Sequence, residues 1–103
     1  MAFGIKREEL IQWKKRAENG EISFLTHFWY DNRFPHCSTV TKAACTDRKK
    51  LLKWGKQYGL KPEWLHNRSD LPHFDLLGEK QREILLKEEK YEQLQKLENR
   101  MKG

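Results

Sequence analysis

The stretch Glu21–Tyr30, EISFLTHFWY, decides the fold of this chain. It is rich in aromatic and β-branched residues, which are typical of strands. Because successive side chains of a strand point to opposite faces, Leu25 and His27 share one face, while Phe24 and Phe28 share the other. Both faces carry apolar side chains, so we expect a central strand with packing on each side.

Two further strands are expected downstream of this one. The turn sequence Asp31–Pro35 ends the first strand, and the more polar stretch Ser38–Cys45 predicts a second strand that follows it. Pro62 begins a short helical turn, since proline suits the first turn of a helix. Beyond it, His73–Leu77 predicts a short third strand.

Three helices surround these strands in the prediction. Lys6–Asn19 has apolar residues at helical spacing and ends at a glycine. Asp47–Tyr58 follows Thr46, which is expected to be its N-cap. A single long helix is expected over Glu79–Met101. The sequence thus predicts one α+β domain over residues 1–103: a small sheet of two or three short strands packed by an N-terminal, a central and a long C-terminal helix. Its end, residues 91–103, is expected to be either frayed or docked on a partner.

Composition places the chain among folded proteins with a very polar surface. Of 103 residues, 35% are charged, yet four Trp, five Phe and three Tyr supply the large apolar area that disordered chains lack. No apolar run approaches the about 18 residues that a membrane span needs, so no membrane partner is expected. The two cysteines, Cys37 and Cys45, are too few to staple a domain and indicate the reducing cytoplasm.

Several motifs together resemble the small YneQ-like proteins of Bacillus and, more loosely, a widespread bacterial domain of unknown function. The resemblance covers about residues 22–84 and implies a fold, without a known reaction. The looser domain has an Asp-rich turn with Arg and an aromatic residue, a Gly-Leu helix end with a following aromatic, and a His-aromatic-Asp triplet. The matching residues are Asp31, Arg33 and Phe34, then Gly59, Leu60 and Trp64, then His73, Phe74 and Asp75. Asn32 stands where that domain often has a second acidic residue, which weakens the case for a two-carboxylate site.

Histidine and aspartate residues are the main candidates for chemistry. In an extended chain His73 and Asp75 point the same way, as do His27 and Asp31, so the four side chains would converge if their strands were neighbours. Imidazole and carboxylate suit a divalent metal or a general acid/base pair. The structural alternative is that His73 and Asp75 only fix a turn and that His27 is a half-buried strand residue.

A basic segment is the second candidate. Residues 47–68 hold seven basic and two acidic side chains, a net charge of +5. On a helical wheel, Lys49, Lys53 and Lys56 lie opposite the apolar stripe of the central helix and form a positive ridge that would attract phosphate backbones. Trp64, just past the end of that helix, is expected to seal the core.

Three functions follow from these candidates. The leading hypothesis is a binding module for a phosphate-bearing ligand, nucleic acid or nucleotide, in a polar pocket beside the lysine ridge; the pocket residues would be Asp31, Arg33, His66, His73 and Asp75. The first alternative is a metal-assisted phosphoester hydrolase, whose divalent ion would be held by His27, Asp31, His73 and Asp75. The second is a regulatory protein that forms a homodimer or binds a protein partner through its C-terminal helix; the contact stripe would be Tyr91, Leu94, Leu97 and Met101.

Overall fold

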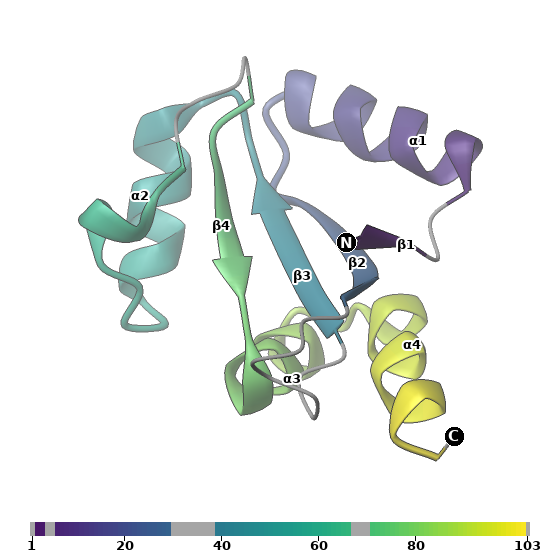
Figure 1. The fold of residues 1–103 in the computed structure, drawn as a ribbon. Coiled ribbons are helices and arrows are strands. Elements are labelled where there is room, and N and C mark those ends of the chain that lie inside the picture. Colours follow the sequence, from purple (N-terminus) through teal and green to yellow (C-terminus); the bar gives the residue numbers. More distant parts are fainter. Residues whose placement is uncertain (1, 4–5, 30–38, 67–70, 103) are drawn as a thin grey trace.

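A four-stranded antiparallel sheet forms the centre of the molecule (Figure 1). The computed structural model describes residues 2–3, 6–29, 39–66 and 71–102. The strands lie in the order β1 (Ala2–Phe3), β2 (Ser23–Trp29), β3 (Thr39–Ala44) and β4 (His73–Leu76), and each pairs with its neighbours in sequence. Three strands have the expected positions, and the two-residue β1 extends the sheet beside β2.

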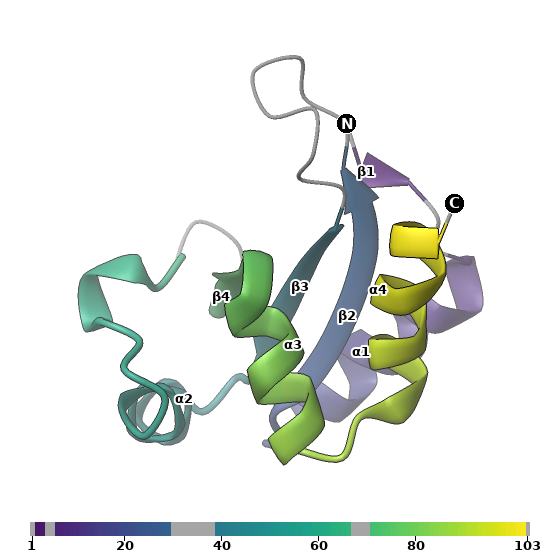
Figure 2. The ribbon, with the colours of Figure 1, turned by 90° about the horizontal axis from the view of Figure 1, so that it is seen from below.

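Helices cover both faces of this sheet. α1 (Arg7–Glu18) packs on one face, whereas α3 (Gly78–Lys87) and α4 (Tyr91–Lys102) cross the other (Figure 2). α2 (Arg48–Lys56) and the short 3₁₀ helix η1 (Pro62–Trp64) lie beside β4. The α+β prediction is therefore confirmed.

The face under α1 has a small apolar core. Trp13 and Ala17 of α1 pack with Leu25 of β2 and Ala44 of β3. The indole Nε1 of Trp13 donates to the carbonyl of Ser23 at 3.1 Å, which satisfies its polar edge inside the core.

The opposite face has the larger core. As the alternation predicts, it contains Phe24 of β2, and the Trp54 ring meets this ring edge to face at 5.6 Å between centroids. Gly55 of α2 packs closely against the Phe74 ring, where a Cβ would lie 2.8 Å from Cε2. The other large members of this core are Leu51, Tyr58, Leu60, Leu76, Ile84, Leu85, Leu94 and Leu97.

The predicted long C-terminal helix is wrong, because the chain breaks between α3 and α4. Glu89 adopts a positive φ of 57°. The Lys90 N–H donates to the Leu85 carbonyl at 2.9 Å and the Glu89 N–H to Leu86 at 3.2 Å, which is a Schellman ending. The break lets α4 fold back beside α3 rather than extend from the body.

Two smaller expectations also fail. The N-cap of α2 is Asp47, whose carboxylate accepts from the Lys50 N–H at 3.1 Å; the hydroxyl of Thr46 instead donates to the Ala17 carbonyl at 2.9 Å. In α4, Leu94 and Leu97 are only 8% and 5% exposed and belong to the chain's own core. They therefore cannot form the predicted contact stripe, and the Met101 side chain lies outside the described residues.

Within the described part of the chain, no helix combines the length and the apolar character that a membrane span requires.

Candidate functional site

A group of polar side chains shares the sheet face that α1 covers. Lys42 of β3 is the cross-strand partner of Leu25 on one side and of Asp75 on the other. Because cross-strand partners share a face, these side chains lie on one surface, together with His73 two residues before Asp75. The apolar contacts of α1 centre on Leu25 and Ala44, so the polar residues lie beside this small core.

His66, His73 and Asp75 come together at the outer end of this surface. His66 pairs with His73 through two backbone hydrogen bonds of 2.8 and 3.1 Å, and their rings stack with centroids 5.2 Å apart. Nε2 of His66 lies 3.1 Å from Oδ2 of Asp75, and Nε2 of His73 lies 3.6 Å from Oδ1. The structure thus gathers three of the five predicted pocket residues around one carboxylate.

Hydrogen bonding fixes the proton of His73. Its Nδ1 lies 3.1 Å from the carbonyl oxygen of Leu71, which can only accept, so Nδ1 carries the hydrogen. Burial lowers the pKa of His73, although its contact with the Leu71 carbonyl and the Asp75 charge act in the opposite direction. In the neutral ring, Nε2 therefore presents a lone pair toward Oδ1 of Asp75, a buried oxygen that accepts no hydrogen bond from any described residue. These two acceptors face each other at 3.6 Å, an arrangement that one shared proton would stabilise.

His27 does not join this group, because β3 lies between β2 and β4. Two strand spacings, about 10 Å, separate β2 from β4, and His27 also lies two residues along β2 from Leu25, the residue level with Asp75. The imidazole of His27 is buried, and this burial lowers its pKa. The sequence predicted a four-residue His/Asp cluster only if the strands of His27 and His73 were neighbours, and β2 and β4 are not neighbours.

Two of the predicted site residues, Asp31 and Arg33, lie outside the described residues, and so does Cys37. Among the residues that are described, no group of three or more His, Cys, Asp or Glu side chains is arranged to hold a metal ion. Cys45 is buried and its thiol is free.

Sequence reasoning missed a cleft of about 750 Å³ between η1 and β4. The prediction that Trp64 seals the core is wrong, because this side chain is 50% exposed at the cleft. Its neighbour Lys61 places Nζ 5.6 Å from the indole centroid. The cleft is bordered by Gly59, Leu60, Glu63, Trp64, Leu65, His66, Phe74, Asp75, Leu76, Leu77 and Lys80.

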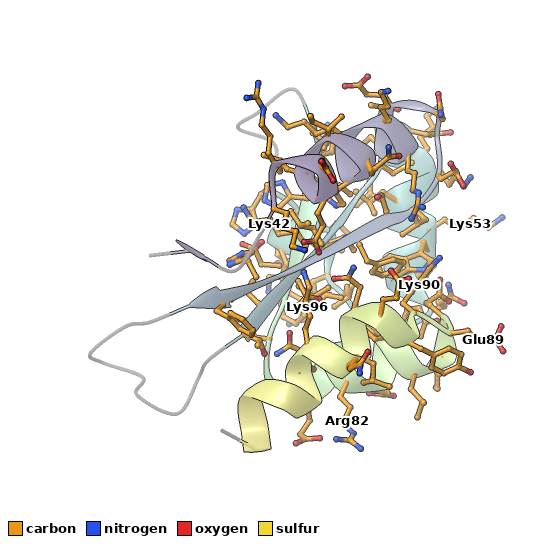
Figure 3. The ribbon with its side chains drawn as sticks, turned by 90° about the vertical axis from the view of Figure 1, so that its right-hand side faces the viewer. Lys42, Lys53, Arg82, Glu89, Lys90 and Lys96 are labelled. Atoms are coloured by element: carbon orange, nitrogen blue, oxygen red, sulfur yellow. The ribbon has the colours of Figure 1, made fainter. Side chains whose placement is uncertain are left out.

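The predicted lysine ridge lies on the solvent side of α2. Lys49, Lys53 and Lys56 are all exposed, while Leu51 and Trp54 of the same helix are buried. Lys53 points away from the body of the molecule (Figure 3). None of the three lysines borders the cleft, so the ridge and the cleft are separate surfaces.

Comparison with known proteins gives one informative match. The chain is 61% identical over 88 residues to "Uncharacterized protein YneQ" of Bacillus subtilis (strain 168), which covers 85% of this chain and 89% of that protein. No protein-family model and no solved structure matches.

Proposed function

The chain belongs to the family of Bacillus subtilis YneQ, an uncharacterised protein, and from its surface we propose that it is a binding module for a phosphate-bearing polymer, a nucleic acid, held by the lysine ridge of α2. The observation that carries this proposal is the charge of α2. Five of its nine residues are basic and none is acidic, and Asp47 at the N-cap is the nearest carboxylate in sequence. The whole chain has a formal net charge of +6, so long-range attraction of a polyanion acts in the same direction.

The spacing of the ridge suits a phosphate backbone. Lys49 and Lys56, with Lys53 between them, lie seven positions apart on the helix, which is about 10 Å at 1.5 Å per residue. One strand of duplex DNA places a phosphate about every 3.4 Å along the helix axis, so the ridge can neutralise about three phosphates. None of these three lysines forms an ion pair with another described residue, whereas Lys50 is held by the Gly20 carbonyl at 2.6 Å.

The cleft supports this ligand less well. Asp75 and Glu63 place carboxylates at its border, and these repel phosphate. We therefore assign the phosphate-bearing ligand to the ridge alone. The roles of Asp31 and Arg33 in ligand binding, and of His27, Asp31, His73 and Asp75 as metal ligands, stay predictions.

Salt dependence of binding tests the proposal. Fluorescence anisotropy with a short labelled DNA duplex, measured over a series of KCl concentrations, gives the slope of log K against log salt. Replacing three phosphate-contacting lysines in Lys49→Ala/Lys53→Ala/Lys56→Ala is expected to reduce the slope by about 2.7, since each neutralised phosphate contributes about 0.9.

The matched control removes the same charge from α1. Lys14, Lys15 and Arg16 are exposed there, and the variant Lys14→Ala/Lys15→Ala/Arg16→Ala has the same net charge as the ridge variant. It is expected to keep most of the slope. If both variants lose affinity equally, only net charge matters; if neither does, the ridge does not bind nucleic acid.

A further inference from the structure

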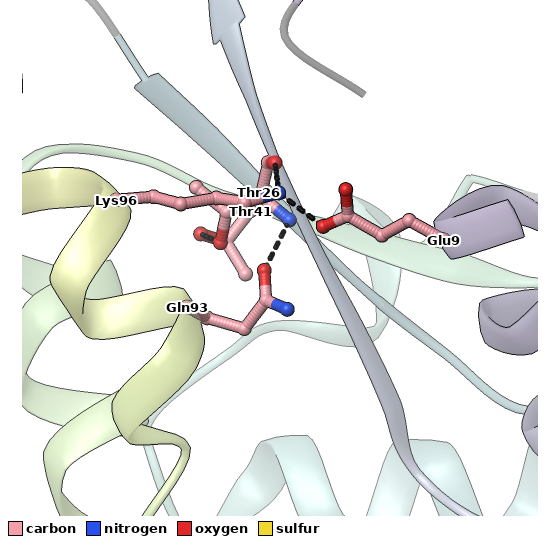
Figure 4. A network of polar contacts seen from close by, with 5 residues as sticks. All are labelled: Glu9, Thr26, Thr41, Gln93 and Lys96. Atoms are coloured by element: carbon pink, nitrogen blue, oxygen red, sulfur yellow. Dashed lines mark hydrogen bonds and ion pairs between the residues drawn. The ribbon is translucent and has the colours of Figure 1, made fainter. Parts of the chain in front are cut away.

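The two outer parts of the sheet differ in how their backbones are protected. On β2, the N–H of Thr26 donates to Oε1 of Gln93 at 2.8 Å, and its carbonyl accepts from Nζ of Lys96 at 3.1 Å (Figure 4). Both partners come from α4, which lies beside this strand (Figure 2). Side chains thus occupy the backbone groups that another strand would need there.

The outer edge of β4 has no such protection at Asp75. The Cys45 N–H donates to the Pro72 carbonyl at 3.2 Å, and hydrogen-bonded pairs alternate along an antiparallel ladder. Phe74 and Leu76 therefore bond to β3. Asp75 lies between them, so its N–H and C=O point away from β3, and no described residue bonds these two groups.

The chain begins to cover this edge and then leaves it. His66 forms hydrogen bonds with both the outward N–H and the outward C=O of His73, which lies two residues before Asp75. The preceding residues turn into η1 instead of continuing along β4. The cleft opens at this point, between η1 and the unpaired Asp75 backbone.

An extended chain lying along β4 would meet apolar side chains on one face of the sheet and polar side chains on the other. On the face of the larger core the lining of the cleft is apolar and includes Leu60, Leu65, Phe74 and Leu76, with the exposed ring of Trp64 at its border. On the α1 face, the Asp75 carboxylate stands beside His66. A strand alternates its side chains with a period of two, which matches these two surfaces.

We propose that an extended segment of a partner protein adds to β4 as a further antiparallel or parallel strand, with a lysine or arginine opposite Asp75 and apolar side chains on both sides of it entering the cleft. Backbone bonds to Asp75 provide the pairing, and the alternating side chains provide the selectivity. This surface lies apart from the lysine ridge, so it goes beyond the proposed nucleic-acid function.

Charge favours a different partner over a second copy of this chain. A symmetric pair of β4 strands centred on Asp75 would place two carboxylates directly opposite each other, which is destabilising. A basic residue at that position instead forms a charge-assisted contact with Asp75.

Nuclear magnetic resonance with a synthetic probe tests the proposal. The probe is a capped peptide in which lysine and valine alternate, titrated into the full ¹⁵N-labelled chain. The Asp75 amide is expected to shift and, at saturation, to exchange its hydrogen about tenfold more slowly, because the peptide then bonds it. A second peptide, N-methylated on the alternate nitrogens that would face β4, keeps the side chains but loses these donors, and its affinity is expected to fall about tenfold.

Two matched variants test the side-chain part. Trp64→Ala removes a half-exposed ring at the cleft, and Tyr91→Ala removes a 59% exposed ring on α4. The first is expected to weaken binding of the probe about tenfold, and the second to leave it unchanged. Asp75→Asn is expected to abolish the preference for the lysine peptide over one with glutamate at the same positions.

Three results would overturn the proposal. These are an Asp75 amide that exchanges at the same rate with and without the peptide, equal binding of the N-methylated peptide, and equal effects of the two ring deletions. Protection of Asp75 that rises with protein concentration in the absence of peptide would assign the edge to a second copy of the chain instead.

Discussion

Glu9 and Lys96 form an ion pair that joins α1 to α4, two helices that pack on opposite faces of the sheet (Figure 4). The same ammonium donates to the Thr26 carbonyl, so one lysine connects both helices to the outer side of β2. Both side chains are mostly buried, which reduces screening by solvent.

Lys96→Met is expected to lower the free energy of unfolding by about 1–3 kcal/mol, because it leaves Glu9 without its cation and the Thr26 carbonyl without its donor. Urea denaturation followed by tryptophan fluorescence measures the change. Lys87→Met is the control: its pair with Glu83 is exposed at 3.7 Å, so we expect a loss of about 0.5 kcal/mol or less. Equal losses would mean that the α1–α4 connection adds nothing.

Stability is expected to fall as the pH drops below about 6.5, the ordinary histidine pKa, toward the lower pKa values of the folded chain. Burial lowers the pKa values of His27 and His73 in the folded chain, so the unfolded chain binds protons first as the pH falls. The state that binds more protons is favoured, and here it is the unfolded one, by up to about 1.4 kcal/mol for each unit of lowered pKa. Denaturation at a series of pH values measures this slope, and His73→Gln is expected to flatten it. An unchanged slope in that variant would exclude His73 as a source.

Glu88 accepts from two aromatic residues of the core, at 3.0 Å from Nε1 of Trp54 and at 2.6 Å from Oη of Tyr58. Glu88→Ala leaves both donors without this acceptor and is expected to cost about 1–3 kcal/mol, measured by thermal or urea unfolding. Glu92→Ala, an exposed carboxylate on α4, is the control and is expected to change stability by about 0.5 kcal/mol or less.

The phenol of Tyr58 gives an independent test of the same contact. Burial, with the Glu88 hydrogen bond and charge, raises its pKa to about 12. In Glu88→Gln the pKa is expected to fall but to stay above the ordinary value near 10, because burial remains. Ultraviolet titration of tyrosinate, with Tyr58→Phe to identify the signal, measures it. A value equal to that of the unmodified protein would rule out the carboxylate as a cause.

Gly55→Ala is expected to destabilise the protein by about 1–3 kcal/mol, although alanine is the better helix former. A Cβ at this position would lie 2.8 Å from Cε2 of Phe74, whose ring is buried in the core. Chemical denaturation measures the loss. Combining it with Phe74→Leu is expected to recover part of it, since the smaller side chain makes room. Additive losses in the double variant would show that this contact is not responsible.

The sequence predicted the strand faces correctly because their period is set by backbone geometry alone. Leu25 and Phe24 lie on opposite faces and belong to different cores, as alternation requires. The glycine endings were also predictable. Gly20 and Gly59 adopt positive φ values of 85° and 75°, which glycine tolerates at little cost.

Other features depend on contacts that local sequence does not encode. Glu89 occupies the left-handed position that glycine usually fills, so no residue type marks the break before α4. Trp64 was expected in the core because an aromatic residue just past a glycine-capped helix usually lies there, yet the turn of η1 leaves it at the cleft. The contact between His66 and Asp75 follows from the strand register, which places both residues on one surface. The strand order separates His27 from them, because β3 lies between β2 and β4. Neither the register nor the strand order can be read from local sequence.

α4 covers the outward backbone groups of Thr26 in β2, and this has a consequence for biosynthesis. Gln93 and Lys96, which hydrogen-bond to the Thr26 backbone, are translated well after β2 and β3. While a ribosome is still making α3, a nascent chain that has already paired β2 with β3 exposes this strand edge to its neighbours. Polysomes hold such chains close together, so slow codons placed shortly before Gln93 are expected to increase co-translational aggregation. The finished protein is protected, because α4 then covers the Thr26 backbone.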